Sequence, residues 1–139
     1  MDKVLTFKQG RVPLLISMPH AGLKLTPAVK AGLIPEAQSL PDTDWHIPQL
    51  YDFATELGAS TLAAEYSRFV IDLNRPQDDA PMYVGATTGL FPATLFEGVP
   101  LFREGQVPTK EERATYLEQI WKPYHQTLQQ ELKDRKSVV

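Results

Sequence analysis

Three short stretches of the sequence carry side chains that suit metal or anion binding. In the first, His20 follows a run of apolar residues and precedes Gly22 by two positions. In α/β proteins, ligands bind beyond the carboxyl ends of strands, so an imidazole at this place is a candidate metal ligand or general base. The alternative is a loop histidine whose ring is hydrogen-bonded to the backbone.

The second stretch is 42–46, which contains Asp42, Asp44 and His46 at the expected start of a helix. Carboxylate oxygen and imidazole nitrogen together suit zinc or another divalent ion. Aspartates in front of a helix are also ordinary N-cap residues, because their oxygens accept hydrogen bonds from the first turn. From the residues alone, capping is the preferred role of both aspartates.

The third stretch is 67–76, in which Asn74 and Arg75 directly follow an apolar run. Arginine binds a planar carboxylate through two parallel hydrogen bonds, and an asparagine amide can donate beside it. Asp72 lies within the apolar run and needs a partner there, since an unpaired buried charge is costly. A structural pair between Asp72 and an arginine is therefore the alternative. His125, near the end of the chain, is given no catalytic role.

An α/β arrangement is expected to position these side chains. Patterns rich in strand formers predict strands over 4–7, 11–18, 60–64 and 69–73. The near-continuous apolar run of 11–18 is typical of a strand that a parallel sheet buries on both faces. Apolar residues at spacings of three and four predict a helix over 45–57 that ends at Gly58, and a helical turn is expected at 27–31.

The second half of the chain predicts a long loop and then a helix. Glycine and proline are dense over 76–108, where aromatic residues indicate an ordered loop with a short extended piece at 94–96. Thr109 and Glu112 form a capping box, and Pro123 is expected to kink the helix that follows. Its packed face is predicted to carry Leu117, Trp121, Tyr124, Leu128 and Leu132.

Length and composition limit the function classes. The 139 residues suit a single domain, 1–139, and a hydrophobic content of 42% suits a globular core. The absence of cysteine excludes a disulfide scaffold and cysteine-ligated zinc, and a net charge of −3 argues against nucleic acid as a partner. No apolar run reaches the roughly 20 residues of a membrane span, so a soluble cytoplasmic protein is expected.

Four segments together resemble one enzyme family. PLLISMPHAG, DTDWHIPQLYDFA, SRFVIDLNRP and WKPYHQTLQQEL, in this order, are similar to N-formylglutamate amidohydrolases, also called deformylases. The resemblance implies metal-dependent hydrolysis of N-formyl-L-glutamate to formate and L-glutamate, in histidine degradation. It also implies a mainly parallel sheet flanked by helices, as in zinc carboxypeptidases and phosphorylase/hydrolase-like folds.

The resemblance also implies a metal site. His20 would be the first ligand of Zn²⁺ or another divalent metal. Carboxypeptidases have a glutamate three residues after this histidine, where Leu23 stands in this chain. The carboxylate ligand is therefore expected to be Asp44, with Asp42 as the reserve. His46 and His125 are further histidines that the resemblance does not assign.

Substrate binding is implied for the third stretch. Asn74 and Arg75 would bind one carboxylate of the substrate, and Arg68 would be a second cation, since N-formylglutamate carries two carboxylates.

Two other classes of function stay open. One is another zinc-dependent deacylase or carboxypeptidase-like hydrolase, and the other is a non-catalytic module that binds carboxylates through Arg68 and Arg75.

Family members are about twice as long as this chain. Their second half carries an Asp-Ala-His-Ser segment that resembles the source of a third zinc ligand, and an acidic residue that would serve as general base. The chain is therefore expected to be the N-terminal portion of such an enzyme, truncated, with weak or no activity by itself. Surfaces exposed by truncation are expected to cause self-association.

Overall fold

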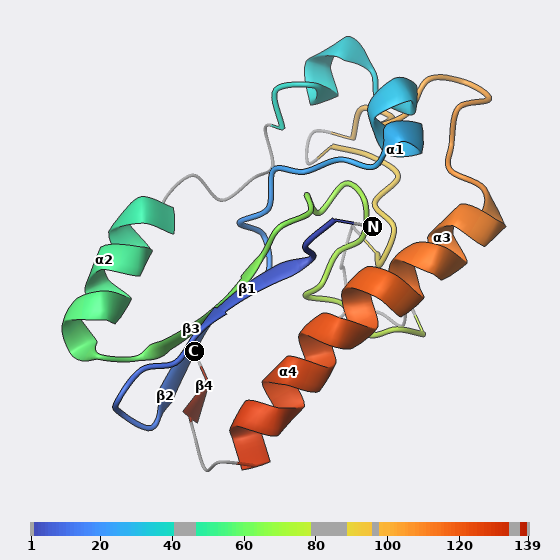
Figure 1. Cartoon of the computed structure of the whole chain (residues 1–139). Coiled ribbons are helices and arrows are strands. Elements are labelled where there is room, and N and C mark those ends of the chain that lie inside the picture. Colours follow the sequence, from blue (N-terminus) through green and yellow to red (C-terminus); the bar gives the residue numbers. More distant parts are fainter. Residues whose placement is uncertain (1, 41–46, 79–88, 96–97, 134–136, 139) are drawn as a thin grey trace.

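A computed structural model describes residues 2–40, 47–78, 89–95, 98–133 and 137–138 (Figure 1). Four strands form one sheet in the order β1-β3-β2-β4. The strands are β1 (Leu5–Lys8), β2 (Leu14–Met18), β3 (Ser60–Ala64) and β4 (Ser137–Val138). β2 pairs in parallel with β3 and with β4, whereas β1 pairs antiparallel with β3. The fold is thus an α/β domain with a mixed sheet.

Helices lie on both sides of the sheet, with α2 on one side and α4 on the other (Figure 1). The helical elements are α1 (Pro27–Gly32), the 3₁₀ turn η1 (Pro35–Ala37), α2 (Ile47–Leu57), α3 (Lys110–Tyr116), the π-helical turn η2 (Leu117–Trp121) and α4 (Lys122–Lys133). No helix among the described residues is long and apolar enough to cross a membrane.

The two faces of β2 belong to different cores, because successive strand residues point to opposite faces. Leu15 lies in the larger core, together with Tyr116, Ile120 and Tyr124 from the long helical segment. Ile16 and Met18 lie in a smaller core whose other buried members are Ala54 and Ala59. The side of the sheet that faces α2 is therefore the less covered one.

Two predicted helix boundaries are confirmed. Gly58 adopts a φ of 76° after α2, a conformation that favours glycine at the end of a helix. The Thr109 hydroxyl accepts a hydrogen bond from the Glu112 N–H, and the Glu112 carboxylate accepts one from the Thr109 N–H. This is the predicted capping box, and it begins α3.

The irregularity expected at Pro123 lies one turn earlier, in η2. There the N–H of Lys122 bonds to the carbonyl of Leu117, five residues back. Proline has no N–H and disfavours the regular α-helical ladder before it, which gives the π-turn a physical cause. The predicted apolar face is correct for Tyr124 but wrong for Leu132, whose side chain is 48% exposed.

The strand predicted over 69–73 is wrong. The apolar residues there are buried, but they follow a turn in which the Val70 N–H bonds to the Ser67 carbonyl at 2.9 Å. The Asp72 N–H bonds to the Leu90 carbonyl at 2.8 Å, so the backbone is satisfied without a strand partner. A short apolar run indicates that its residues are buried, but it does not distinguish a strand from a packed turn.

The predicted ordered loop before α3 is confirmed in its described parts. Leu101 and Phe102 are buried, and isolated bridges join Leu33 to Phe102 and Thr94 to Pro100. The aromatic residues Tyr83 and Phe96 lie outside the described residues. β4, by contrast, was not predicted from the sequence.

The capping box predicts a measurable stability contribution. Thr109→Ala removes the acceptor for the Glu112 N–H, and we expect it to lower the free energy of unfolding by about 1 kcal/mol. Thr115→Ala is the matched control, because that exposed hydroxyl donates to a carbonyl within α3 and its loss should cost less than about 0.5 kcal/mol. Urea denaturation compares the two, and equal losses would contradict the role of the cap.

Candidate functional site

The buried carboxylate of Asp72 connects three parts of the chain. One oxygen, Oδ1, lies 2.6 Å from His20 Nε2 and also accepts the Asn74 N–H at 2.9 Å. The other oxygen, Oδ2, accepts a hydrogen bond from Arg68 Nη2 at 3.1 Å. Asp72 is fully buried and Arg68 is nearly so, while the side chain of His20 is 22% exposed. The imidazole therefore has one side toward the carboxylate and another toward solvent.

Close backbone packing brings His20 to Asp72. Gly22 lies against the segment that follows β3, where an added Cβ would be 2.1 Å from the Tyr66 carbonyl oxygen. Next to it, the Lys24 N–H bonds to the Glu65 carbonyl at 3.0 Å, and the Ser67 N–H bonds to the Lys24 carbonyl at 2.8 Å. The loop after β2 is thus held beside the segment that leads to Arg68 and Asp72.

The electrostatics of this cluster favour an ionised Asp72. Burial by itself raises the pKa of the carboxyl, but several interactions oppose it: the hydrogen bond and charge of His20, the Asn74 N–H and the Arg68 guanidinium. Together they hold the pKa of Asp72 below its ordinary value. An ionised carboxylate only accepts hydrogen bonds, so the His20 Nε2 carries the proton. In the neutral ring, Nδ1 then keeps its lone pair.

Two aromatic side chains of the long helical segment hold the backbone on either side of Asn74. The Trp121 Nε1–H donates to the Arg75 carbonyl at 2.9 Å, and the His125 Nε2–H donates to the Leu73 carbonyl at 2.8 Å. Their rings are stacked with centroids 3.9 Å apart. Burial lowers the pKa of His125 and outweighs the hydrogen bond to the Leu73 carbonyl, which raises it. The lowered pKa favours a neutral ring.

An open cavity of about 290 Å³ lies at this place. It is lined by Leu73, Asn74, Arg75, Pro76, Trp121 and His125. Asn74 is exposed and Arg75 half-buried, and the Arg75 Nη1 also donates to the Asn74 carbonyl at 3.0 Å. The cavity combines an amide and a guanidinium with an apolar wall, a combination that suits a small carboxylate ligand.

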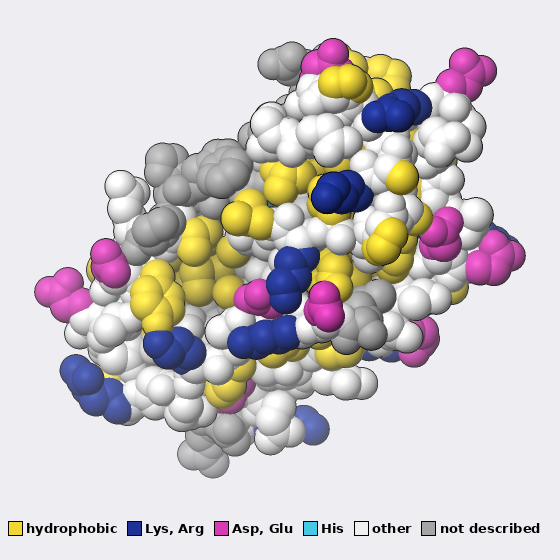
Figure 2. All heavy atoms as spheres, turned by 45° about the horizontal axis from the view of Figure 1, so that its top comes forward, with side chains coloured by type: hydrophobic (Ala, Val, Ile, Leu, Met, Phe, Trp, Pro, Cys, Tyr) yellow, Lys and Arg dark blue, Asp and Glu magenta, His cyan; other side chains and the backbone are white. Residues whose placement is uncertain are grey.

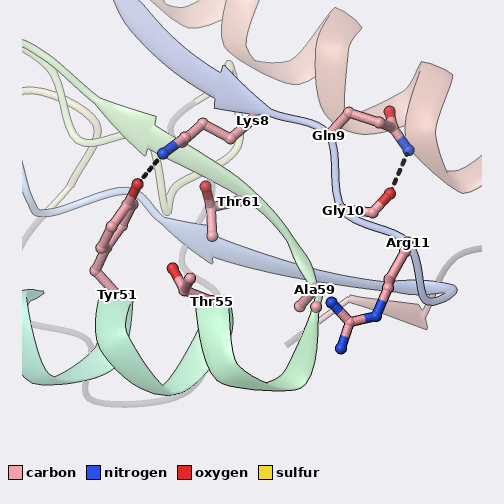
Figure 3. A pocket seen from close by; sticks show the side chains of 9 residues that line it. Lys8, Gln9, Gly10, Arg11, Tyr51, Thr55, Ala59 and Thr61 are labelled. Carbon is pink, nitrogen blue, oxygen red and sulfur yellow. Dashed lines mark hydrogen bonds between the residues drawn. The ribbon is translucent and has the colours of Figure 1, made fainter.

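A larger pocket of about 390 Å³ lies near the beginning of β3, at the other end of the sheet from His20. Figure 3 shows Lys8 pointing to Tyr51, to whose hydroxyl its ammonium donates, and Arg11 lying beside Ala59. The Arg11 side chain also covers Gly58, at the end of α2. A cation is favourable at the C-terminus of a helix, where the helix dipole is negative, so Arg11 has a structural role at the end of α2.

The structure places the predicted residues in different surroundings. His20, Asp72, Asn74 and Arg75 belong to one end of the domain, as expected for groups beyond strand ends. Arg68, predicted as a second substrate cation, is buried against Asp72, which is the structural pair kept as the alternative. Its role toward substrate stays a prediction.

The second ligand stretch, Asp42, Asp44 and His46, lies outside the described residues. Within the described part of the chain, no three His, Asp or Glu side chains come together as a metal-binding group.

Sequence reasoning missed two contacts. It did not pair His20 with Asp72, although a buried aspartate and a histidine after a strand both needed partners. It also set aside His125, whose spacing of four from Trp121 places both rings on the same side of the helix.

Comparisons with known proteins place this chain beside members of one family. Residues 12–138 match the family model described as N-formylglutamate amidohydrolase. The chain is 76% identical over 132 residues to an N-formylglutamate deformylase of Pseudomonas putida, covering 95% of this chain and 49% of the relative. It is 69% identical to one of Pseudomonas aeruginosa, covering 95% and 50%. The chain thus spans about half the length of these relatives.

Two solved structures share the fold. An N-formylglutamate amidohydrolase from Ralstonia eutropha JMP134 aligns with a TM-score of 0.74 at 22% identity, covering 94% of this chain and 51% of that one. A protein from Agrobacterium tumefaciens aligns with a TM-score of 0.76 at 18% identity, covering 96% and 51%. At these identities the likeness concerns the fold.

Asp72 is expected to make stability depend on acidic pH. Because its pKa is lowered in the folded chain, the ionised form contributes stability that is present above the ordinary value of 3.8 and is lost as pH falls toward the folded-state pKa. Asp72→Asn lacks this contribution and leaves Arg68 and His20 without their anion, at a cost of about 3 kcal/mol or more near neutral pH.

Thermal unfolding from about pH 6 to about pH 3 tests this dependence. The difference in Tm between wild type and Asp72→Asn should shrink as the pH falls. Asp52→Asn, on the exposed surface of α2, is the control and should follow the wild type throughout. A difference that stays constant across the pH range would contradict the role assigned to Asp72.

The indole hydrogen bond can be tested separately from the ring. Trp121→Phe removes the N–H that reaches the Arg75 carbonyl and keeps an aromatic ring beside His125, so we expect a loss of about 1 kcal/mol. Tyr51→Phe is the control, since it removes a hydroxyl bonded to an exposed lysine and should cost less than about 0.5 kcal/mol. Urea denaturation measures both variants, and faster amide exchange over 73–75 in Trp121→Phe would support the anchoring role.

Proposed function

The chain belongs to the N-formylglutamate amidohydrolase family, and on this premise we propose that it acts in the hydrolysis of N-formyl-L-glutamate to formate and L-glutamate. The observation that carries the proposal is the cluster around Asp72, which places an oriented imidazole beside the segment of Asn74 and Arg75. The place of this reaction in histidine degradation, and a cytoplasmic location, are further predictions from the family resemblance.

Substrate binding is assigned to Asn74 and Arg75. N-formyl-L-glutamate is a dianion at neutral pH, and the Arg75 guanidinium suits one of its carboxylates through paired hydrogen bonds. The Asn74 amide donates beside it, and the Trp121 and His125 rings hold the backbone of both residues. Rigid anchoring of a remote carboxylate orients the formyl group for reaction.

A metal ion is proposed to bind at His20. The donor chemistry fits, because Asp72 engages Nε2 and leaves Nδ1 as a ligand, an arrangement common for metal-binding histidines. Asp44 is proposed as the carboxylate ligand, on the basis of the resemblance. A divalent ion bound there would supply Lewis-acid activation of the formyl carbonyl and of water. In the overall reaction water adds to the formyl carbon, the C–N bond breaks, and the amine of glutamate leaves with a proton.

Ligand binding tests the substrate site. We expect the purified chain to bind N-formyl-L-glutamate in calorimetry, and Arg75→Ala to weaken binding at least about tenfold through loss of the charged partner. Arg103→Ala, an exposed arginine in the loop before α3, should leave the affinity unchanged. Equal effects of the two substitutions would contradict the assignment of Arg75.

Formate release tests the reaction and its metal dependence. We expect turnover of N-formyl-L-glutamate by this half-length chain to be weak at most, to require added zinc and to fall to background in His20→Ala. Zinc-independent turnover would contradict the metal proposal. Turnover of N-acetyl-L-aspartate in place of N-formyl-L-glutamate would indicate another deacylase, and metal-independent glutamate binding with no turnover would indicate a carboxylate-binding module.

A further inference from the structure

A dianion in the cavity beside Trp121 meets one arginine, which matches only one of its two charges. Among the described residues that line this cavity, the arginine is Arg75. Arg68 is not one of the lining residues, and its side chain is 7% exposed with Nη2 donating to Asp72. Figure 2 shows basic and acidic side chains intermixed on one face of the molecule, so individual groups rather than a broad positive surface set the charge there. The second positive charge is therefore sought in the cavity itself.

His125 is the other side chain of this cavity that can carry a positive charge. Its Nε2–H donates to the Leu73 carbonyl at 2.8 Å. In the described part of the chain, Nδ1 has no hydrogen-bond partner and does not belong to the buried unpartnered atoms, so it stays accessible. Nδ1 of the neutral ring is only an acceptor, and it can bind a carboxylate once it carries a proton.

Without a ligand, the surroundings keep this ring neutral. Burial lowers the pKa of His125 more than the hydrogen bond to the Leu73 carbonyl raises it. The Arg75 guanidinium lines the same cavity, and a second cation beside it is unfavourable. A carboxylate bound next to the ring reverses this balance, because it favours the protonated form.

The other titratable groups near the ring do not take over this role. Tyr124 meets the ring edge-on at 5.7 Å between centroids, and burial raises the pKa of its phenol to about 12, so it is neutral. Lys122 and Glu118, on the same helical segment, pair with each other. Asp72 precedes Leu73 in the chain, and its carboxylate is already engaged by the donors described above.

We propose, on the basis of the proposed function, that His125 takes up a proton from solvent when a dicarboxylate binds, and that its Nδ1–H then donates to the carboxylate that Arg75 does not hold. The proton adds a donor without removing one, since Nε2–H stays on the Leu73 carbonyl. The stacked Trp121 ring, 3.9 Å away between centroids, favours the imidazolium further. Two positive charges then balance the two of the ligand. His125 thereby makes the site selective for dicarboxylates over monocarboxylates.

Calorimetry in two buffers of different ionisation enthalpy counts the protons that are taken up. The purified 139-residue chain, without added metal, is titrated near neutral pH with N-formyl-L-glutamate and with its two monoamides, each of which lacks one carboxylate. We expect uptake of up to one proton with N-formyl-L-glutamate, and none with the monoamide that lacks the carboxylate held by His125. The affinity for N-formyl-L-glutamate should fall about tenfold between about pH 6 and about pH 8, because the protonated ring is lost as pH rises through the raised pKa of the complex.

Two substitutions locate the proton. His125→Gln cannot be protonated but keeps an amide N–H for the Leu73 carbonyl. It should lose the proton uptake and the pH dependence, while its affinity for that monoamide stays within about twofold of the wild type. His20→Gln is the matched control, since it removes the other described histidine and should leave the uptake unchanged.

An NMR titration of the His125 ring in the wild-type chain needs neither a variant nor a formyl group. Glutarate, a plain five-carbon dicarboxylate, is the probe. On its binding, the midpoint of the His125 titration should move upward by at least about one pH unit, because the bound carboxylate favours the charged ring.

The outcomes separate this role from the proposed reaction. Binding of N-formyl-L-glutamate that depends on Arg75 but brings no proton uptake would overturn the role of His125 and leave the proposed substrate site in place. Uptake that persists in His125→Gln, or that disappears in His20→Gln, would overturn it as well. Glutarate binding with the expected change at His125, but no turnover of N-formyl-L-glutamate, would establish the dicarboxylate site and count against the proposed reaction. A chain that binds none of these ligands would contradict both.

Discussion

A single buried carboxylate, that of Asp72, determines how the candidate site is built. A charge with no exposed surface must be matched by donors, and here they come from the loop after β2, from Arg68 and from the Asn74 backbone. Satisfying Asp72 therefore fixes the position of His20 and the path of the chain into Asn74. The same contact that permits burial of the charge also engages Nε2 of His20, so that Nδ1 is the ring nitrogen left for another partner.

The segment after Asp72 is held from a second direction. Trp121 and His125 bond to the carbonyls of Arg75 and Leu73, so the anchoring backbone lies between the buried carboxylate and a pair of stacked rings. These constraints act without a regular strand. They explain how a turn-rich segment can hold an amide and a guanidinium in a defined geometry.

Local patterns in the sequence predicted the local structure well. The cap at Thr109, the left-handed Gly58 and the strand at 60–64 depend on neighbouring residues, and all three are confirmed. The strand expected at 69–73 does not form, because these residues are buried by tertiary packing and do not pair with another strand. The contacts of the site also escaped prediction, since His20 and Asp72 are 52 positions apart and Trp121 and Arg75 are 46 apart. The expected ligand Asp44 lies outside the described residues.

The π-turn η2 determines which way the side chains of α4 point. A π-turn accommodates one residue more than an α-turn, and each residue of an α-helix turns by about 100°. If the same five residues of 117–121 formed a regular α-helix instead, everything after them would be rotated by about 100° relative to α3. The rings of Trp121 and His125 would then leave the carbonyls they now reach, while Tyr116 stayed in the core. The π-turn thus sets the phase of α4 relative to α3, a constraint that does not act at the exposed end of α4, where Leu132 and Lys133 face solvent.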